Sequence, residues 1–236
     1  MARSISIVEY KAQQTHFFLE KIGEAELDFF AAQCFVDAFV IAARSITFAM
    51  QAVISDVPGF AEWYKVQQSE MKNDAICRFF NEYRTVSTHI GDTVVKGFTT
   101  GKNNDGSRAI NYYFQPIADL PDVPQDDVQT VCTYYFKALL GLVFGAMQTF
   151  KYQLDDRWYF TRENFIRLGK TADDADEELG FPRGWTDIGG AYNEEERWRA
   201  LRHAQTVGCQ LNDLFVVYLG KAILGPDDDP EPALQS

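Results

Sequence analysis

The sequence has few of the residues that build disulfide frameworks and transition-metal sites. Its 236 residues include four cysteines and three histidines. The cysteines are widely spaced in apolar, helix-like contexts, so we expect reduced, buried thiols and no disulfide framework. No histidine stands four residues from another, which argues against zinc and di-iron sites. We therefore expect no metal and no other cofactor.

Long apolar runs are also missing. The longest one, Ala138 to Met147, has ten residues, whereas a helix needs about 20 to cross a bilayer. The first 14 residues hold no apolar core of signal-peptide length. The sequence therefore predicts a cytoplasmic protein without a membrane segment.

Positive charge is scarce. Lys and Arg number 22 against 34 Asp and Glu, which gives a net charge of −12. Such a chain repels phosphates on average, so any chemistry on a nucleic acid has to occur in a local exception to this field. Apolar residues make up 46% of the chain, which excludes wholesale disorder.

The remaining patterns predict a mainly α protein with one β-hairpin. Residues 1–224 are expected to form a single helical domain, and residues 225–236 a disordered acidic tail. β-branched and aromatic residues flank a Gly/Asn/Asp cluster at 93–114, which is typical of a hairpin. Helices are predicted over about 24–55, from Pro58 to Gly91 with a break near Asn73, over 128–154, and from a capping box at Asn193 and Glu196.

A narrow polar stripe runs along the apolar helix predicted at 24–55. Its members recur at seven or eleven residues and fall within about 40° of one another around the helix axis; they are Glu26, Gln33, Arg44 and Gln51, with Asp37 beside them. One interpretation is a stripe facing solvent or surface ion pairs. The other is that Asp37 and Arg44 line a polar cleft or a dimer seam. In either case we expect Arg44 to pair with Asp37 or with an acid on a neighbouring helix, because an unpaired buried guanidinium is costly.

The pair Arg84 and His89 is the candidate catalytic site. A guanidinium can bind two non-bridging oxygens of a phosphodiester and neutralise charge that develops in the transition state. An imidazole titrates near neutral pH and can move the proton of a 2′-hydroxyl or of a leaving group. On one regular helix the two positions are about 140° apart. They can therefore act together only if the helix frays before Gly91 or if two copies meet across a two-fold axis.

Here the chain resembles the HEPN superfamily, whose ribonuclease members carry an Arg followed after four to six residues by a His. The matching part comprises the apolar first helix, the aromatic region Trp63 to Tyr83, and the pair Arg84 and His89. The resemblance implies a HEPN-like helical bundle and metal-independent RNA cleavage at the interface of a homodimer. The G-x-x-x-G of Gly141 and Gly145, which favours close helix contact, also points to a dimer.

Charge favours the same region. Residues 72–115 hold six bases against four acids, a net of +2, so this patch could accept RNA. Within it, Lys96, Lys102 and Arg108 are the candidate substrate-binding residues. A second pair of matching spacing, Arg197 and His203, is assigned to the surface.

The leading function is therefore an endoribonuclease or ribonuclease-like effector of a toxin–antitoxin or defence system. One alternative is a non-catalytic HEPN-like module that binds a companion protein. Another is an acidic antitoxin or immunity-type protein that masks a basic partner, which the net charge favours.

Overall fold

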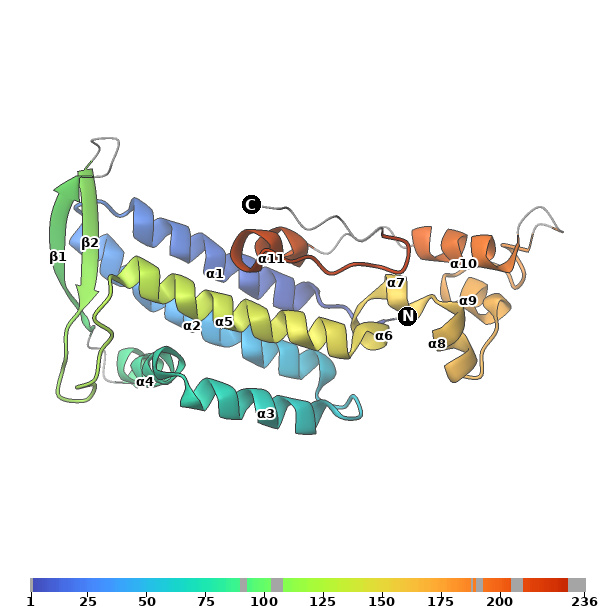
Figure 1. Cartoon of the computed structure of the whole chain (residues 1–236), viewed down its shortest axis with the longest axis horizontal. Coiled ribbons are helices and arrows are strands. Elements are labelled where there is room, and N and C mark those ends of the chain that lie inside the picture. The colour runs from blue at the N-terminus through green and yellow to red at the C-terminus, as the bar shows by residue number, and fades with distance from the viewer. Residues whose placement is uncertain are drawn as a thin grey trace. The chain divides into compact units, whose positions relative to one another are not determined.

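The computed structural model describes residues 2–89, 93–102, 108–187, 189, 193–204 and 210–228 (Figure 1). These residues form helices and one antiparallel two-stranded sheet, which confirms a mainly α protein with a hairpin. The chain divides into two compact units. The N-terminal unit is Ser6–Leu142, and the C-terminal unit is Val143–Ser236 together with Met1–Ile5.

The N-terminal unit holds the long helices and the hairpin. Its elements are α1 (Ser6–Glu24), α2 (Phe29–Ile54), α3 (Phe60–Asn73), α4 (Ala75–His89), β1 (Val95–Lys102), β2 (Arg108–Phe114) and the first part of α5 (Val128–Thr149). Figure 1 shows α1, α2 and α5 side by side, with the hairpin across one end of these helices. Contacts agree with this arrangement, because α5 meets α1 through His16 and Phe136 and meets α2 through Phe39 and Tyr135.

Two helix boundaries differ from the sequence prediction. The apolar helix begins at Phe29 rather than near residue 24, because Glu26 has a left-handed backbone (φ 46°) and the Asp28 carboxylate caps α2 by accepting from the amide of Ala31. The predicted break near Asn73 is confirmed. Its cap, however, is Asp74, which accepts a hydrogen bond from the amide of Cys77.

Stacked aromatic rings form the core of the N-terminal unit. Phe80 of α4 stacks on Tyr135 of α5 with centroids 4.4 Å apart, and its edge meets Phe39 of α2 at 6.0 Å. Phe79 contacts Phe114 of β2 at 4.9 Å, so the hairpin packs on the same core. Aromatic pairs of this kind add about 0.5–1.5 kcal/mol each beyond the burial of their surface. This core fixes α4 between α2 and α5.

The C-terminal unit is made of short helices. They are α6 (Lys151–Leu154), α7 (Asp156–Tyr159), α8 (Arg162–Arg167), α9 (Ala172–Glu178), α10 (Glu194–His203) and α11 (Leu211–Leu219). The capping box of Asn193 and Glu196 is confirmed at the start of α10. Phe160, Phe165 and Trp198 form the centre of a buried cluster.

The cysteines follow the prediction in part. Cys77 and Cys132 are buried free thiols, but Cys34 is exposed on α2. The prediction of burial was wrong for Cys34 because it lies on the face of α2 that the N-terminal unit leaves uncovered. Cys209 lies outside the described residues.

The beginning of the predicted acidic tail is held by arginines. Asp227 accepts two hydrogen bonds from Arg202, at 2.6 and 2.7 Å, and Asp228 accepts one from Arg157 at 2.9 Å. Arg202 is only 4% exposed, so Asp227 compensates a buried charge. Residues 229–236 of the predicted tail lie outside the described part of the chain.

Two helices, α2 and α5, are long and apolar enough by length and composition to cross a membrane. Core helices of soluble proteins pass the same test, and in α5 more than half of the relevant window is buried within the protein. The absence of a membrane segment therefore stays a prediction.

Candidate functional site

Arg84 lies on α4, directly after the buried Tyr83. Its side chain is half-buried, and its Nε atom is buried without a hydrogen-bond partner. Within the described residues we find no ion pair of Arg84. A guanidinium in this state keeps hydrogen-bonding capacity that a ligand can use, because a buried donor gains from any acceptor brought to it.

His89 is the last residue of α4, and its side chain lies outside the described part of the structure. Because α4 is helical through residue 89, positions 84 and 89 stand about 140° apart around one helix axis. The helix α4 therefore does not fray before His89. Gly91, the predicted stop, lies outside the described residues.

The predicted pairing of Arg44 was wrong. Asp37 accepts a hydrogen bond of 2.6 Å from the Tyr83 hydroxyl, and Arg44 bonds through Nη1 to Thr47 Oγ1 at 3.1 Å. The Arg44 guanidinium also stacks over the ring of Phe48 at 4.6 Å. No acid pairs with Arg44 among the described residues. The two side chains do not meet because seven residues of helix separate them by about 10 Å along the axis, and Tyr83 reaches Asp37 from α4.

The polar stripe on α2 faces other elements of the unit. Gln33 donates to the Val95 carbonyl of β1 at 2.8 Å, and Gln51 donates to the Tyr64 hydroxyl of α3 at 3.1 Å. Together with the Asp37–Tyr83 bond, these contacts place the stripe against α3, α4 and β1. The structure therefore supports the polar cleft for Arg44, which lines it, whereas Asp37 is not among the described lining residues and Glu26 is exposed before α2 begins.

This cleft contains a pocket with a volume of about 120 Å³. It lies within the N-terminal unit, between α2, α3, α4 and α5, and its lining comprises Arg44, Tyr64, Gln68, Met71, Lys72, Cys77, Arg78, Asn81 and Tyr135. Three of these residues are cationic, and none of the lining residues described is acidic. In a chain with a net charge of −12, this is a local exception to the negative field.

The charges of Arg44 and Arg84 both affect the hydroxyl of Tyr135, one of the residues that line the pocket. Burial is the main reason that the pKa of the Tyr135 hydroxyl is raised, and the two guanidinium groups oppose that shift. Arg84 is therefore near Tyr135 although it does not line the pocket. Burial, reinforced by the Asp74 carboxylate, raises the pKa of the Cys77 thiol to about 12, so this thiol is protonated and a poor nucleophile at neutral pH.

The three predicted substrate-binding residues are on the hairpin. Lys96 is exposed on β1, and Lys102 is paired in the sheet register with Arg108 on β2. The side chains of Lys102 and Arg108, and the turn at 103–107, lie outside the described residues. The structure thus places Lys102 and Arg108 directly opposite each other. Lys96 is not among the described residues that line the pocket.

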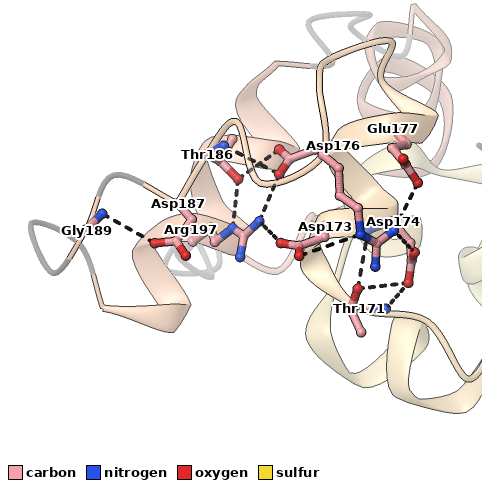
Figure 2. A network of polar contacts seen from close by, with 10 residues as sticks. Thr171, Asp173, Asp174, Asp176, Glu177, Thr186, Asp187, Gly189 and Arg197 are labelled. Carbon is pink, nitrogen blue, oxygen red and sulfur yellow. Dashed lines mark hydrogen bonds and ion pairs between the residues drawn. The ribbon is translucent and has the colours of Figure 1, made fainter.

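Of the second Arg/His pair, only His203 is on the surface as predicted. Arg197 is mostly buried and donates to Asp176 at 2.8 Å, to Asp173 at 2.6 Å and to Thr186 at 2.8 Å (Figure 2). Asp176 is fully buried and also accepts from the Thr186 hydroxyl. Hydrogen bonds from Nε and Nη2 of Arg197 therefore hold α10 to α9 and to Thr186. Its role is structural, and the assignment of Arg197 to the surface was wrong.

Metal chemistry finds no support in the part of the chain that the structure describes, where no three His, Cys, Asp or Glu side chains cluster closely enough to hold an ion. The pocket residues that sequence reasoning missed are those that come from other helices, such as Tyr64, Gln68 and Tyr135. Lys72 and Arg78 belong to the basic stretch at 72–115. That stretch and the polar stripe that contains Arg44 were the signals of the pocket in the sequence, because its other walls meet only on folding.

Comparison with known proteins gives one match. The model of the family described as bacteriophage lambda protein ea47 matches residues 5–133, which is more than half of the chain. No curated protein and no solved structure matches the sequence. The matched residues include α1 to α4, the hairpin and the first residues of α5. The chain therefore belongs to the bacteriophage lambda protein ea47 family.

Proposed function

We propose that the N-terminal unit is a HEPN-like bundle and that it cleaves RNA without a metal ion, using Arg84 and His89. The observation that carries the proposal is the half-buried guanidinium of Arg84, whose Nε atom is buried and unpaired. By contrast, Nε and Nη2 of the structural Arg197 donate hydrogen bonds to Thr186, Asp173 and Asp176.

The proposed reaction is an internal transfer. His89 takes the proton of the RNA 2′-hydroxyl, and the 2′-oxygen attacks the adjacent phosphorus. The bond from phosphorus to the 5′-oxygen breaks, and the leaving 5′-oxygen takes a proton from water. Arg84 binds the non-bridging oxygens and stabilises the charge that builds on them. The products are a 2′,3′-cyclic phosphate and a 5′-hydroxyl end.

The geometry of α4 makes the site a shared one. Because positions 84 and 89 point about 140° apart, we propose that Arg84 of one protomer acts with His89 of the partner subunit in a homodimer. Support comes from α5, where Gly141 is exposed and a Cβ placed on it would contact nothing within 4 Å. The predicted close helix contact is therefore not made within the chain at Gly141, which leaves this position open to a second copy.

The test is an RNA cleavage assay on the full chain in EDTA. His89→Ala is expected to lower the rate by about 10² to 10⁴, the usual contribution of a general acid or base, and Arg84→Ala to lower it comparably. Lys137→Ala, which removes an exposed cation of α5, is the matched control and should leave the rate within about twofold. Wild-type protein that leaves RNA intact would overturn the proposal.

A second candidate function is a non-catalytic module that binds a companion protein. Phe30, Ile41 and Phe48 are 74%, 53% and 52% exposed, and they lie within about 20° of one another on α2. An apolar stripe of this kind is typical of a protein interface. If the wild type does not cleave RNA but the triple change of these residues to Ser abolishes capture of a companion protein, this function replaces the first.

A further inference from the structure

We infer that the pocket between α2, α3, α4 and α5 binds a phosphate monoester. Three cations, Arg44, Lys72 and Arg78, line it. A phosphate monoester carries close to two negative charges at neutral pH and accepts several hydrogen bonds, so it matches a site with this excess of donors. Arg84 is not among the described lining residues. The inference uses neither Arg84 nor His89 and therefore does not depend on the proposed cleavage.

The cations of the pocket are not neutralised by the protein. Arg44 bonds only to a hydroxyl and a ring, and its Nε atom is buried without a partner. Lys72 makes no ion pair within the described residues. Cationic side chains held close together repel one another unless an anion joins them, so the arrangement is most stable with an anion bound.

Arg78 is held in place by neutral groups. Its Nη1 donates to the carbonyls of Lys72 and Asn73, at 2.9 and 3.0 Å. These bonds anchor the guanidinium at the end of α3 and leave its charge uncompensated. Asp74, four residues before Arg78, is occupied by the Cys77 amide at 2.7 Å and the Tyr134 hydroxyl at 2.8 Å. Glu82, four residues after Arg78, forms no ion pair with it among the described residues. Arg78 is thus preorganised for an anion, which lowers the entropy lost on binding.

The remaining wall offers neutral hydrogen-bonding groups. The Tyr64 oxygen accepts from Gln51, which leaves the Tyr64 proton for a ligand. Gln68 and Asn81 supply amide groups, and each amide has both donors and an acceptor. The pocket volume of about 120 Å³ is several times the roughly 15 Å³ that one water needs. It therefore has room for a phosphate group and part of the carbon skeleton that carries it.

Isothermal titration calorimetry of the full chain tests the inference. The probes are ribose 5-phosphate and a short 2′-deoxy oligonucleotide with either a 5′-phosphate or a 5′-hydroxyl, which the proposed ribonuclease cannot cut. We expect saturable binding of at least one phosphorylated probe and at least tenfold weaker binding of the 5′-hydroxyl strand. Preference for ribose 5-phosphate would identify a free small ester as the ligand, and preference for the phosphorylated strand would identify a nucleic-acid end.

Variants distinguish binding in the pocket from nonspecific attraction to charges elsewhere on the protein. Arg44→Gln and Lys72→Gln should each weaken binding about tenfold or more, since a hydrogen bond to a charged group is lost. Gln68→Glu, which adds an acid to the lining at an exposed position, should abolish binding without lowering the melting temperature, since the added carboxylate offsets the repulsion among the cations. Lys137→Gln removes a charge outside the pocket and should change the Kd less than twofold. The inference is overturned if no phosphorylated probe binds, or if Lys137→Gln weakens binding as much as Lys72→Gln.

Discussion

The hydroxyl of Tyr83 donates a hydrogen bond of 2.6 Å to Asp37 and thereby ties α4 to α2 at the residue before Arg84. Tyr83 is fully buried, and its hydroxyl also lies 3.3 Å from the Thr93 hydroxyl. Burial raises the pKa of Asp37, and the bond from Tyr83 opposes that shift. The bond therefore fixes the position of Arg84 and satisfies a partly buried carboxylate at the same time.

Tyr83→Phe should lower the free energy of unfolding by about 1–3 kcal/mol, because Asp37 loses the donor that compensates its burial. Urea denaturation of the full chain measures the change. Tyr134→Phe is the matched control, since the Tyr134 hydroxyl also donates to an acid but from an exposed position. Tyr134→Phe should change the free energy of unfolding by no more than about 0.5 kcal/mol. Equal losses for the two variants would contradict the argument that burial makes the Tyr83 bond contribute more to stability.

Arg197→Ala should destabilise the protein strongly, by about 3–5 kcal/mol, because it leaves the buried Asp176 carboxylate without its cation. Arg183→Ala removes an exposed arginine that pairs with Asp174 and Glu177, and such surface pairs contribute about 0–1 kcal/mol. Calorimetric melting of both variants compares the two. A loss for Arg197→Ala no larger than that for Arg183→Ala would contradict a structural role for Arg197.

Acid should weaken the start of α9. The Arg183 hydrogen bond, together with bonds from the Thr171 amide and hydroxyl, lowers the pKa of Asp174 from 3.8 to about 2. A lowered pKa stabilises the folded state above the unfolded value, and this contribution is lost as the pH falls towards the folded value. Melting temperatures of wild type and Asp174→Asn should therefore differ at pH 5 and converge between pH 4 and pH 2. A difference that stays constant over this range would contradict the assignment.

Local patterns in the sequence predict the elements well where their signal is short-range. The hairpin at 93–114 and the capping box at Asn193 follow from turn and cap chemistry, and both are present. The start of α2 was misplaced because Ala25 and Leu27 extend the apolar pattern towards the N-terminus. The left-handed backbone of Glu26 that interrupts the helix leaves no mark in composition.

The candidate site could be predicted only in part. Lys72, Arg78 and Arg84 stand in one basic stretch, and the two helices that carry them, α3 and α4, were predicted from the sequence with a break near Asn73. The hydrogen bond between Asp37 and Tyr83 joins residues that are 46 positions apart. Tyr64 and Tyr135 line the pocket from two separate helices, α3 and α5. Such contacts depend on how the helices pack, and periodicity along one segment carries no information about them.

Mixing two inactive variants tests whether the proposed site is shared between protomers. A dimer of one Arg84→Ala chain and one His89→Ala chain has one site with both groups intact if the site forms across the two-fold axis. An equimolar mixture should then recover about a quarter of the wild-type cleavage rate, because half of the dimers are mixed and each has one working site of two. A mixture as inactive as its components would contradict the shared site.

The most direct measurement of the central claim is mass spectrometry of the ends left on a short RNA incubated with the protein in EDTA. Transfer to the 2′-oxygen predicts 2′,3′-cyclic phosphate and 5′-hydroxyl ends, and no cleavage where a 2′-deoxy nucleotide replaces the reacting one. Arg84→Ala and His89→Ala proteins should leave the same RNA intact over the time that the wild type needs to cut it. An intact RNA with the wild type, or ends carrying a 5′-phosphate and a 3′-hydroxyl, would contradict the proposed function.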